Sequence, residues 1–427
     1  MKVLIVGGGG REHAIALKIK ENPEVTALYA APGNGGIAQI ATCLPFKATD
    51  VDGIVRWAAE NKVDFVIVAP DDPLCLGMVD ALAAQGIPAF GPRKNAAIIE
   101  GSKVFSKNLM KKYGIPTAAY ETFDDYVEAV KYLQTADMPI VVKADGLALG
   151  KGVLICPDRD SAVEAVASMM KEAKFGASGA RVVIEEFLTG PEVSVLAFTD
   201  GKTVKPMVSS MDHKRALDHD EGLNTGGMGT IAPNPCYTPE LAQRCMDEIF
   251  LPTIAAMNAE GRTFTGCLYF GLMMTPKGPK AIEYNCRFGD PETQVVLPLL
   301  KSDLLTIMRA TVDGTLADTP VEFTSGAACC VVLASGGYPV SYKSGYPISG
   351  LDEAGKTATV FHAGTKLVDG QIVTAGGRVL GVTATANTLE AAIDKAYQAA
   401  DKITFTDMHM RRDIGQRALA SRKESHS

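Results

Sequence analysis

Short apolar runs alternate with amphipathic helical patterns along residues 1–100 of this chain. Apolar runs lie at 3–6, 65–69 and 88–90, and helical periodicity appears between them at 53–61 and 76–85. Because a helix that connects two strands returns the chain to a parallel neighbour, this alternation predicts a parallel sheet covered by helices. A chain of 427 residues exceeds what one hydrophobic core supports, so about three domains are expected.

The pattern changes twice further along the chain. Residues 103–188 mix helical segments with short strands, and longer strands follow at 192–200, 265–275 and 279–288, with one helix predicted over 239–258. Small-residue strands at 326–337 and 376–386, with a helix at 388–401, predict a separate terminal domain. The fold class is therefore α/β and α+β multidomain, divided into 1–102, 103–325 and 326–427, with a smaller subdomain over 122–189.

Charge and cysteine usage narrow the classes of function. The net charge of −7 argues against a general nucleic-acid or anionic-membrane surface, although a local basic pocket remains compatible with it. The nine cysteines are scattered and never spaced C-x-x-C, which predicts reduced thiols. No stretch approaches the roughly 20 apolar residues of a membrane span. We therefore expect a cytoplasmic protein without nucleic-acid or membrane partners, and a monomer is compatible with the sequence.

The chain opens with a strand that runs into four glycines, Gly7 to Gly10, and then a helix. Backbone N–H groups at a helix N-terminus attract phosphate, so a dinucleotide site is the first interpretation. However, Glu12 stands where the third glycine of G-x-G-x-x-G belongs, and the second strand ends in Ala30, Ala31 and Pro32 without an acid for a ribose. The loop therefore predicts a phosphate site other than that of NAD, with a ligand-free tight turn as the alternative.

The stretch KAIEYNCRFGDPE carries the sharpest chemical signal. Glu283 and Asn285 lie two apart on a predicted strand, so both side chains leave the same face, and Arg287 continues that face. A carboxylate beside an amide oxygen suits a hard cation such as Mg²⁺, and a guanidinium suits a phosphoryl group. The stretch predicts a metal and phosphoryl site, whereas a solvated polar strand face is the alternative.

Three further stretches suggest ligand contacts. VVKADGLALGKGVLI places Lys143 on a strand before a glycine loop that joins two strands, which differs from a Walker loop and resembles a lid over phosphates. VVIEEFLTGPE sets acids against an apolar strand, and burying them requires partners. DHKRALDHDEGLNTGGMG combines basic side chains with glycines that permit close backbone approach. An ordinary hairpin, structural glutamates and a mobile surface loop are the respective alternatives.

With these stretches in this order, the chain resembles the ATP-grasp ligases and, among them, the phosphoribosylamine–glycine ligase family. The motifs that carry the resemblance are GGGGREHA, APGNGG, EGSKVFSK, KADGLALGKGV, EEFLTGPE, DHKR with NTGGMG, and EYNCRFGDPETQ. The resemblance implies an N-terminal Rossmann-like substrate domain, a lid, an ATP-grasp domain and a C-terminal domain that completes the cleft. It also implies an ATP-dependent ligation of glycine to 5-phosphoribosylamine in purine biosynthesis, through glycyl phosphate, with Mg²⁺ or Mn²⁺.

Residue roles follow from the resemblance. It implies catalytic roles for Lys143 and Arg287 and metal binding by Glu283 and Asn285. The expected ATP contacts are Lys103, Lys143, Gly146, Gly150, Lys151, Gly152, Glu185, Glu186, Phe187, Leu188 and Glu192. The expected contacts of the other substrates are Gly8, Gly9, Gly10, Asp212, His213, Lys214, Gly226, Gly227, Arg287 and Asp290.

Two positions depart from the expected pattern. The strand LYFGLMMT offers no acid as a further metal ligand, and APDDPL has Asp71 and Asp72 where a glutamate is expected. Three alternatives to the implied activity remain open. They are another ATP-grasp carboxylate–amine ligase or carboxylase, a nucleotide-binding module without turnover, and, more remotely, a dehydrogenase.

Overall fold

The N-terminal region forms the expected parallel sheet. In this computed structural model, which describes residues 1–146, 152–171 and 179–424, five strands pair in the order β3-β2-β1-β4-β5. Val3, Leu4, Ile5 and Val6 of the central strand are fully buried because helices cover both faces. The strands are β1 Lys2–Gly7, β2 Ala27–Pro32, β3 Thr42–Cys43, β4 Phe65–Val68 and β5 Ala89–Phe90; the helices are α1 Gly10–Lys20, α2 Val51–Glu60, α3 Asp71–Cys75, α4 Met78–Ala84 and α5 Lys94–Gly101.

A smaller antiparallel sheet follows α6 (Lys103–Lys112), in the order β6-β9-β7-β8. Its strands are β6 Tyr120–Phe123, β7 Ile140–Ala144, β8 Val153–Cys156 and β9 Val182–Glu186, and it packs against α7 Tyr126–Leu133 and α8 Arg159–Met170. Helix α8 begins at Arg159 because the side chain of Asp158 accepts the backbone N–H of Ser161 and so caps the helix. This sheet has its own apolar core, so it forms a separate layer beside the cavity described below.

The central sheet is antiparallel, with the order β11-β10-β16-β17. Its strands are β10 Glu192–Thr199, β11 Val204–Pro206, β16 Gly266–Thr275 and β17 Gly278–Asn285. The single helix predicted over 239–258 is divided into α9 Pro239–Cys245, a π-helical turn at Met246–Phe250 and α10 Leu251–Ala259. Pro252 has no N–H to continue the regular helical ladder, which accounts for the break.

The terminal sheet combines strands from two distant parts of the chain. Its order is β12-β15-β18-β22-β19, with β12 Met211–Asp212 and β15 Gly229–Ala232 joined to β18 Ala327–Ala334, β19 Thr359–His362 and β22 Arg378–Ala386. Two hairpins flank it, β13 Arg215–Leu217 with β14 Glu221–Asn224 and β20 Thr365–Val368 with β21 Gln371–Thr374. The remaining helices are α11 Thr293–Val296, α12 Leu304–Asp313, α13 Leu351–Gly355, α14 Leu389–Ala400 and α15 Gln416–Glu424.

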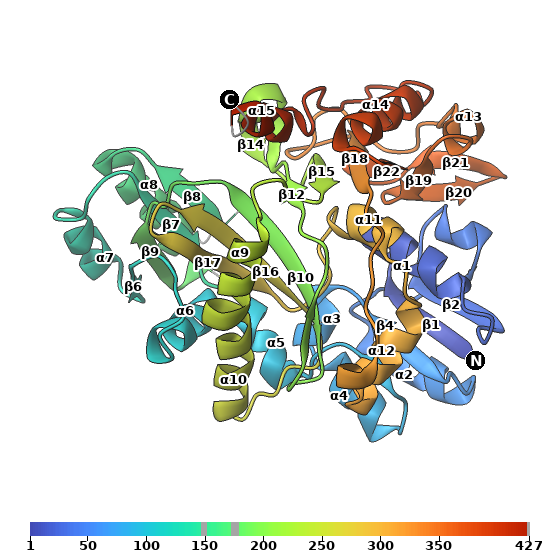
Figure 1. The fold of residues 1–427 in the computed structure, drawn as a ribbon, viewed down its shortest axis with the longest axis horizontal. Coiled ribbons are helices and arrows are strands. Elements are labelled where there is room, and N and C mark those ends of the chain that lie inside the picture. Colours follow the sequence, from blue (N-terminus) through green and yellow to red (C-terminus); the bar gives the residue numbers. More distant parts are fainter. Residues whose placement is uncertain (147–151, 172–178, 425–427) are drawn as a thin grey trace.

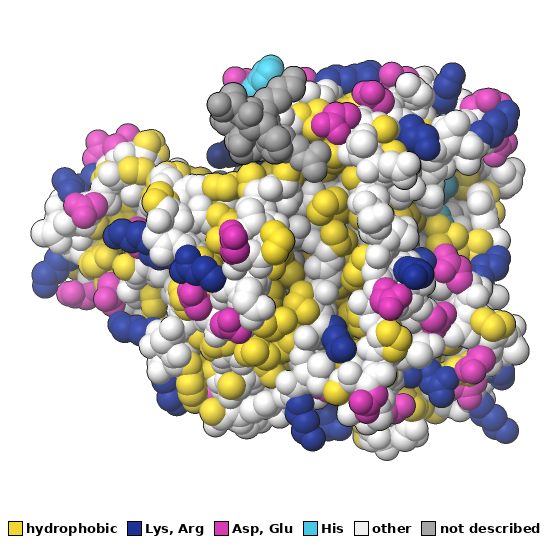
Figure 2. Space-filling model, in the orientation of Figure 1, with side chains coloured by type: hydrophobic (Ala, Val, Ile, Leu, Met, Phe, Trp, Pro, Cys, Tyr) yellow, Lys and Arg dark blue, Asp and Glu magenta, His cyan; other side chains and the backbone are white. Residues whose placement is uncertain are grey.

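The other sheets lie around the central sheet of β10, β16 and β17 (Figure 1). The small sheet of β6 to β9 lies at the left, the N-terminal region at the lower right and the terminal sheet at the upper right. Phe90, Phe198 and Phe288 pack against one another, with ring centroids 5.8 to 6.3 Å apart, and join the N-terminal region to the central sheet. On the face in Figure 2, hydrophobic side chains gather in the middle, where Figure 1 shows α9 and α10. No helix of the described residues is long and apolar enough to cross a membrane.

Candidate active site

A cavity of about 740 Å³ lies between the small sheet and the central sheet. Its lining comes from α5, α6, β7, β9 and β17 and from further elements of the other sheets, so segments far apart in the chain must meet to build it. Among the residues singled out from the sequence, its lining includes Lys103, Lys143, Gly146, Gly152, Glu185, Glu186, Phe187, Leu188, Glu192, Asp212, Lys214, Gly226, Glu283, Asn285, Arg287 and Asp290. Gly150 and Lys151 lie outside the described residues. The individual roles stay predictions.

Glu283 and Asn285 both face this cavity from β17. A bulge inserts Ile282 between the pairs Ala281–Leu272 and Glu283–Gly271, so Glu283 lies directly opposite Gly271. A side chain at position 271 would come within 2.7 Å of the Cγ atom of Glu283. The glycine in LYFGLMMT thus leaves room for the Glu283 side chain.

Glu100, which is not among the residues singled out from the sequence, hydrogen-bonds three neighbouring residues of the site. Its buried carboxylate accepts hydrogen bonds from the Cys286 backbone N–H at 2.7 Å, and from Asn285 Nδ2 and Arg287 Nη2 at 3.0 Å each. Burial raises the pKa of Glu100, although the charge of Arg287 opposes the rise. The only signal in the sequence was its position before GSK, at the end of a helix.

The oxygen atoms of Glu283 and Asn285 fit a divalent cation. Because the Asn285 amide nitrogen donates to Glu100, its Oδ1 atom is left as an acceptor, and the described residues donate no hydrogen bond to it. Burial would raise the pKa of Glu283, but the charges of Lys214, Lys143 and Lys103 outweigh it and lower the pKa. The described residues contain no cluster of three or more His, Cys, Asp or Glu side chains suited to a metal. Water molecules and the phosphate oxygens of a bound nucleotide are the usual further ligands of such a cation.

Three lysines, Lys103, Lys107 and Lys143, also line the cavity, and Lys143 Nζ donates to the carbonyl oxygen of Ile282, next to Glu283. Lys103 Nζ donates to the carbonyl oxygen of Gly146 at 2.6 Å. Lys143 Nζ forms an ion pair with Glu185, whose other oxygen lies 2.5 Å from Lys107 Nζ. Burial lowers the pKa of Lys107 to about 8. Lys107 is not among the residues singled out from the sequence. Glu185 is an expected ATP contact, and in the structure its carboxylate pairs with Lys107 and Lys143.

The side chains of the DHKR segment point in two directions, some into the cavity and His213 into the interior. Asp212 and Lys214 line the cavity, and Lys214 Nζ lies 3.1 Å from Glu192 and 3.7 Å from Glu283. His213 points the other way: its Nδ1 lies 3.1 Å from the Gly229 carbonyl oxygen, and its Nε2 accepts the N–H of Gly415. Burial, and then the charge of Arg411, lower its pKa to about 4. The structure thus separates His213 from the other predicted substrate contacts.

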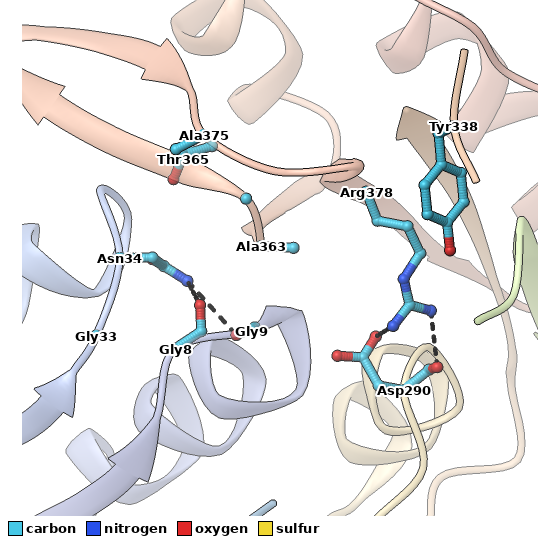
Figure 3. A pocket seen from close by; sticks show the side chains of 11 residues that line it. Gly8, Gly9, Gly33, Asn34, Asp290, Tyr338, Ala363, Thr365, Ala375 and Arg378 are labelled. Atoms are coloured by element: carbon cyan, nitrogen blue, oxygen red, sulfur yellow. Dashed lines mark hydrogen bonds and ion pairs between the residues drawn. The ribbon is translucent and has the colours of Figure 1, made fainter. Parts of the chain in front are cut away.

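A second cavity, of about 360 Å³, lies where the N-terminal region meets the terminal sheet (Figure 3). Gly8 and Gly9 line it, whereas Gly10 begins α1 and packs against Gln294. Glu12 Oε2 accepts the Gly9 N–H at 2.6 Å and so caps the helix within the loop. This carboxylate takes the backbone donor that a dinucleotide phosphate would need.

Arg378 separates the two cavities, and it was also missed. It lines both, together with Asp290 and Tyr338. Its guanidinium donates to the carbonyl oxygens of Gly226 and Asp290 and pairs with the Asp290 carboxylate at 3.4 Å (Figure 3). Tyr338 Oη accepts the N–H of Gly226. Gly227 lies against Asp212 and Pro291, where a Cβ atom would be 2.5 to 2.6 Å from each, so only glycine fits there.

Comparisons with known proteins cover nearly the whole chain. Models of the phosphoribosylglycinamide synthetase N domain, ATP-grasp (A) domain and C domain match residues 1–100, 101–293 and 328–417. A phosphoribosylamine–glycine ligase of Halalkalibacterium halodurans is 48% identical over 425 residues, covering 100% of this chain and 99% of that protein. One of Agrobacterium fabrum is 48% identical, covering 99% and 100%.

Solved structures agree with the sequence comparisons. A phosphoribosylamine–glycine ligase from Thermotoga maritima superposes with a TM-score of 0.86 at 34% identity, covering 97% of this chain and 100% of that one. A biotin carboxylase from Campylobacter jejuni has a TM-score of 0.75 at 15% identity, covering 96% and 92%. The second likeness concerns the fold alone.

Proposed function

The chain belongs to the phosphoribosylamine–glycine ligase family, and from this premise we propose that it joins glycine to 5-phosphoribosylamine with cleavage of ATP. The products are glycinamide ribonucleotide, ADP and phosphate. The observation that carries this proposal is a cavity with cation ligands and lysines that meets a second cavity at Asp290, Tyr338 and Arg378. Such an arrangement suits a reaction in which a nucleotide and a second phosphorylated substrate act on one small acid.

We propose that glycine reacts through an acyl phosphate. A carboxylate is a poor electrophile, so a glycine oxygen first attacks the γ-phosphorus of ATP and ADP leaves. The amine nitrogen of phosphoribosylamine then attacks the carbonyl carbon, phosphate leaves and the nitrogen loses a proton. Positioning and charge neutralisation dominate such phosphoryl transfer. Lys143 and Arg287, which face the cavity, are suited to both tasks.

A divalent cation held by Glu283 and Asn285 would neutralise charge on the phosphoryl oxygens. Mg²⁺ is proposed because both ligand atoms are hard oxygens, with Mn²⁺ as a substitute. The remaining residues are proposed to contact ATP itself. Lys103 and Lys143 are proposed to hold its phosphates. The adenine is proposed to lie against Glu186, Phe187 and Leu188, and the ribose against Glu192, all of which line the cavity.

The smaller cavity is proposed to hold the phosphoribosyl group. Its wall includes Gly8, Asn34 and Thr365, so a glycine backbone and small polar side chains would lie beside a bound phosphate, whereas the Gly9 N–H is already taken by Glu12. We also propose the division into domains at 102/103 and 325/326, with β12 and β15 crossing into the terminal sheet.

Isotope transfer tests this function. Glycine labelled with ¹⁸O in its carboxylate should yield phosphate that contains one ¹⁸O atom, and ADP release should require both glycine and phosphoribosylamine. Replacing either substrate by another acid or amine should reduce ADP release to background. ADP release with a different acid–amine pair would instead support another ligase, and ATP binding without any release would support a non-catalytic module.

A further inference from the structure

Glu292 is an unmatched carboxylate in the wall of the larger cavity. It is 4% exposed and lines the cavity just before α11. Among the described residues, no other residue donates a hydrogen bond to its carboxylate or forms an ion pair with it; only its own backbone N–H contacts it. Gly289 leaves the space beside it open, since a Cβ atom there would lie 2.4 Å from Glu292 Oε2. A buried carboxylate without a partner is costly unless a ligand supplies the partner.

A second carboxylate faces the same region. Asp212 lines the cavity, and burial followed by the charge of Glu292 raises its pKa well above the ordinary value. Asp212 Oδ1 accepts the His213 backbone N–H at 2.8 Å. Gly227 approaches the same oxygen closely without covering it with a side chain. The two acids together make one end of the cavity receptive to a cationic group.

A cationic group with an unmatched donor lies near these acids. Arg287 lines the cavity and is close enough to Glu292 for the two charges to shift each other's pKa. Its Nε atom is buried and has no hydrogen-bond acceptor, although its terminal nitrogens bond to Glu100 and to the Phe288 carbonyl oxygen. The cavity therefore presents unmatched acceptors and an unmatched donor within one small region.

An α-amino acid matches both the two carboxylates and the unmatched donor of Arg287, because it carries an ammonium group and a carboxylate. Of the three proposed substrates, ATP and phosphoribosylamine carry phosphates that two carboxylates would repel, whereas glycine carries an ammonium group beside its carboxylate. We propose that Glu292 and Asp212 bind the ammonium group of glycine and direct its carboxylate towards Arg287 and the nucleotide. This inference rests on the proposed function and extends it, because it assigns the amino-acid subsite.

The subsite also separates the two amines of the reaction. Neighbouring carboxylates favour the charged form of a bound amine and keep it protonated. A protonated amine has no lone pair, so the glycine nitrogen cannot attack an acyl phosphate. The amine of phosphoribosylamine, bound away from this pair, remains the nucleophile. The pair thus protects the activated glycine from condensing with a second glycine.

The substitution Glu292→Gln tests the subsite because it keeps the shape and removes the charge. With glycine, kcat/KM should fall about 100-fold, while the KM for ATP should change less than twofold. The preference for glycine over glycolate, which has a hydroxyl group in place of the ammonium, should fall at least tenfold. Asp212→Asn should act in the same direction. Glu221→Gln, an exposed acid on β14, is the control and should leave both values unchanged.

A binding measurement on the wild-type protein tests the subsite even if a variant folds poorly. For the wild-type protein with Mg²⁺ and a non-hydrolysable ATP analogue, glycine should raise the Tm, and equal concentrations of acetate or glycolate should not. An unchanged glycine KM and an unchanged preference in folded Glu292→Gln would overturn the subsite, as would a rise confined to the KM for ATP. Stabilisation of the wild type by acetate equal to that by glycine would also overturn it. Absence of glycine-dependent ADP release from the wild type would instead refute the proposed function itself.

Discussion

Charged side chains from separate elements line the larger cavity, whereas the smaller cavity is built mainly from backbone. Six of the eleven residues that line the smaller cavity are glycine or alanine. In the larger one, Glu185 holds two lysines and Glu100 holds Asn285 and Arg287. The larger site therefore depends on particular charges, and the smaller on how closely loops approach one another. Substitutions in the larger cavity should therefore lower the rate of the reaction, and substitutions in the smaller cavity should weaken the binding of its substrate.

The largest effect is expected in the larger cavity, for Glu283→Ala and Asn285→Ala. Each removes a proposed cation ligand, so ADP release should fall by a factor of about 10³ or more. The Tm should stay within a few degrees, because the Glu283 side chain is 35% exposed. Lys277→Ala, in the turn of the same hairpin, is the control. Full activity in both ligand variants would refute the metal assignment.

A smaller effect is expected when one lysine of the buried cluster is removed. Lys107→Met should destabilise the protein by about 3 kcal/mol, because Glu185 loses one of its two cationic partners in a buried site. Urea unfolding monitored by circular dichroism measures the change. Lys111→Met, one turn further along α6 and exposed, should change stability by less than about 0.5 kcal/mol. Equal losses in both variants would mean that Glu185 does not need Lys107.

In the smaller cavity, Gly8→Ala should weaken the binding of phosphoribosylamine without removing a reactive group. An added Cβ atom would lie 2.4 Å from the carbonyl oxygen of Gly33, so the two loops must move apart. The KM for phosphoribosylamine should rise about tenfold, while the KM for ATP should change little. Gly355→Ala has open space around the new methyl group and serves as the control. A rise in the KM for ATP alone would contradict the assignment of the smaller cavity.

The effect that is smallest at neutral pH, and that grows only on acidification, is expected beside the smaller cavity, where His13 and His362 join α1 to β19. His13 Nδ1 accepts the His362 N–H at 2.8 Å. Burial and the neighbouring His362 lower the pKa of His13 to about 3, and burial lowers that of His362 to about 4. Only the unfolded chain takes up these protons as the pH falls below about 6.5. Each histidine should therefore lower the free energy of unfolding by about 1.4 kcal/mol per pH unit, down to its folded pKa.

The histidine prediction is checked by unfolding at a series of pH values. His13→Asn should reduce the loss of stability between pH 6 and pH 4, because one buried neutral histidine is gone. His219→Asn is the control: His219 is exposed with φ of 61°, a conformation that asparagine tolerates. An unchanged slope in His13→Asn would show that His13 takes up its proton in the folded state.

The spacing of residues along single segments predicted much of the fold and part of the site. The alternation over residues 1–100 predicted the parallel sheet, and that prediction is confirmed. The two-residue spacing of Glu283 and Asn285 predicted that both side chains face one side, and both line the cavity. The same reasoning failed to separate His213 from Lys214, because it could not tell which neighbour would be buried against Gly229 and Gly415.

Partners from distant segments could not be inferred from spacing. Glu100 is 185 residues from Asn285, and Glu292 is 80 residues from Asp212, so no local pattern relates either pair. Arg378 lies on a strand of the terminal sheet and reaches Gly226 and Asp290 only because β12 and β15 pair into that sheet. Each of these residues looks like an ordinary polar position when its own segment is considered alone.

The amino-acid sequence by itself determined the periodicities, the glycine turns and the chemical type of the ligand atoms, because these depend on a few adjacent residues. The tertiary structure alone decided which charges neutralise one another, which carboxylate is left without a partner and where two cavities meet. Burial and Coulomb energies depend on distance in space, and for residues far apart in the chain that distance is set only when the sheets pack.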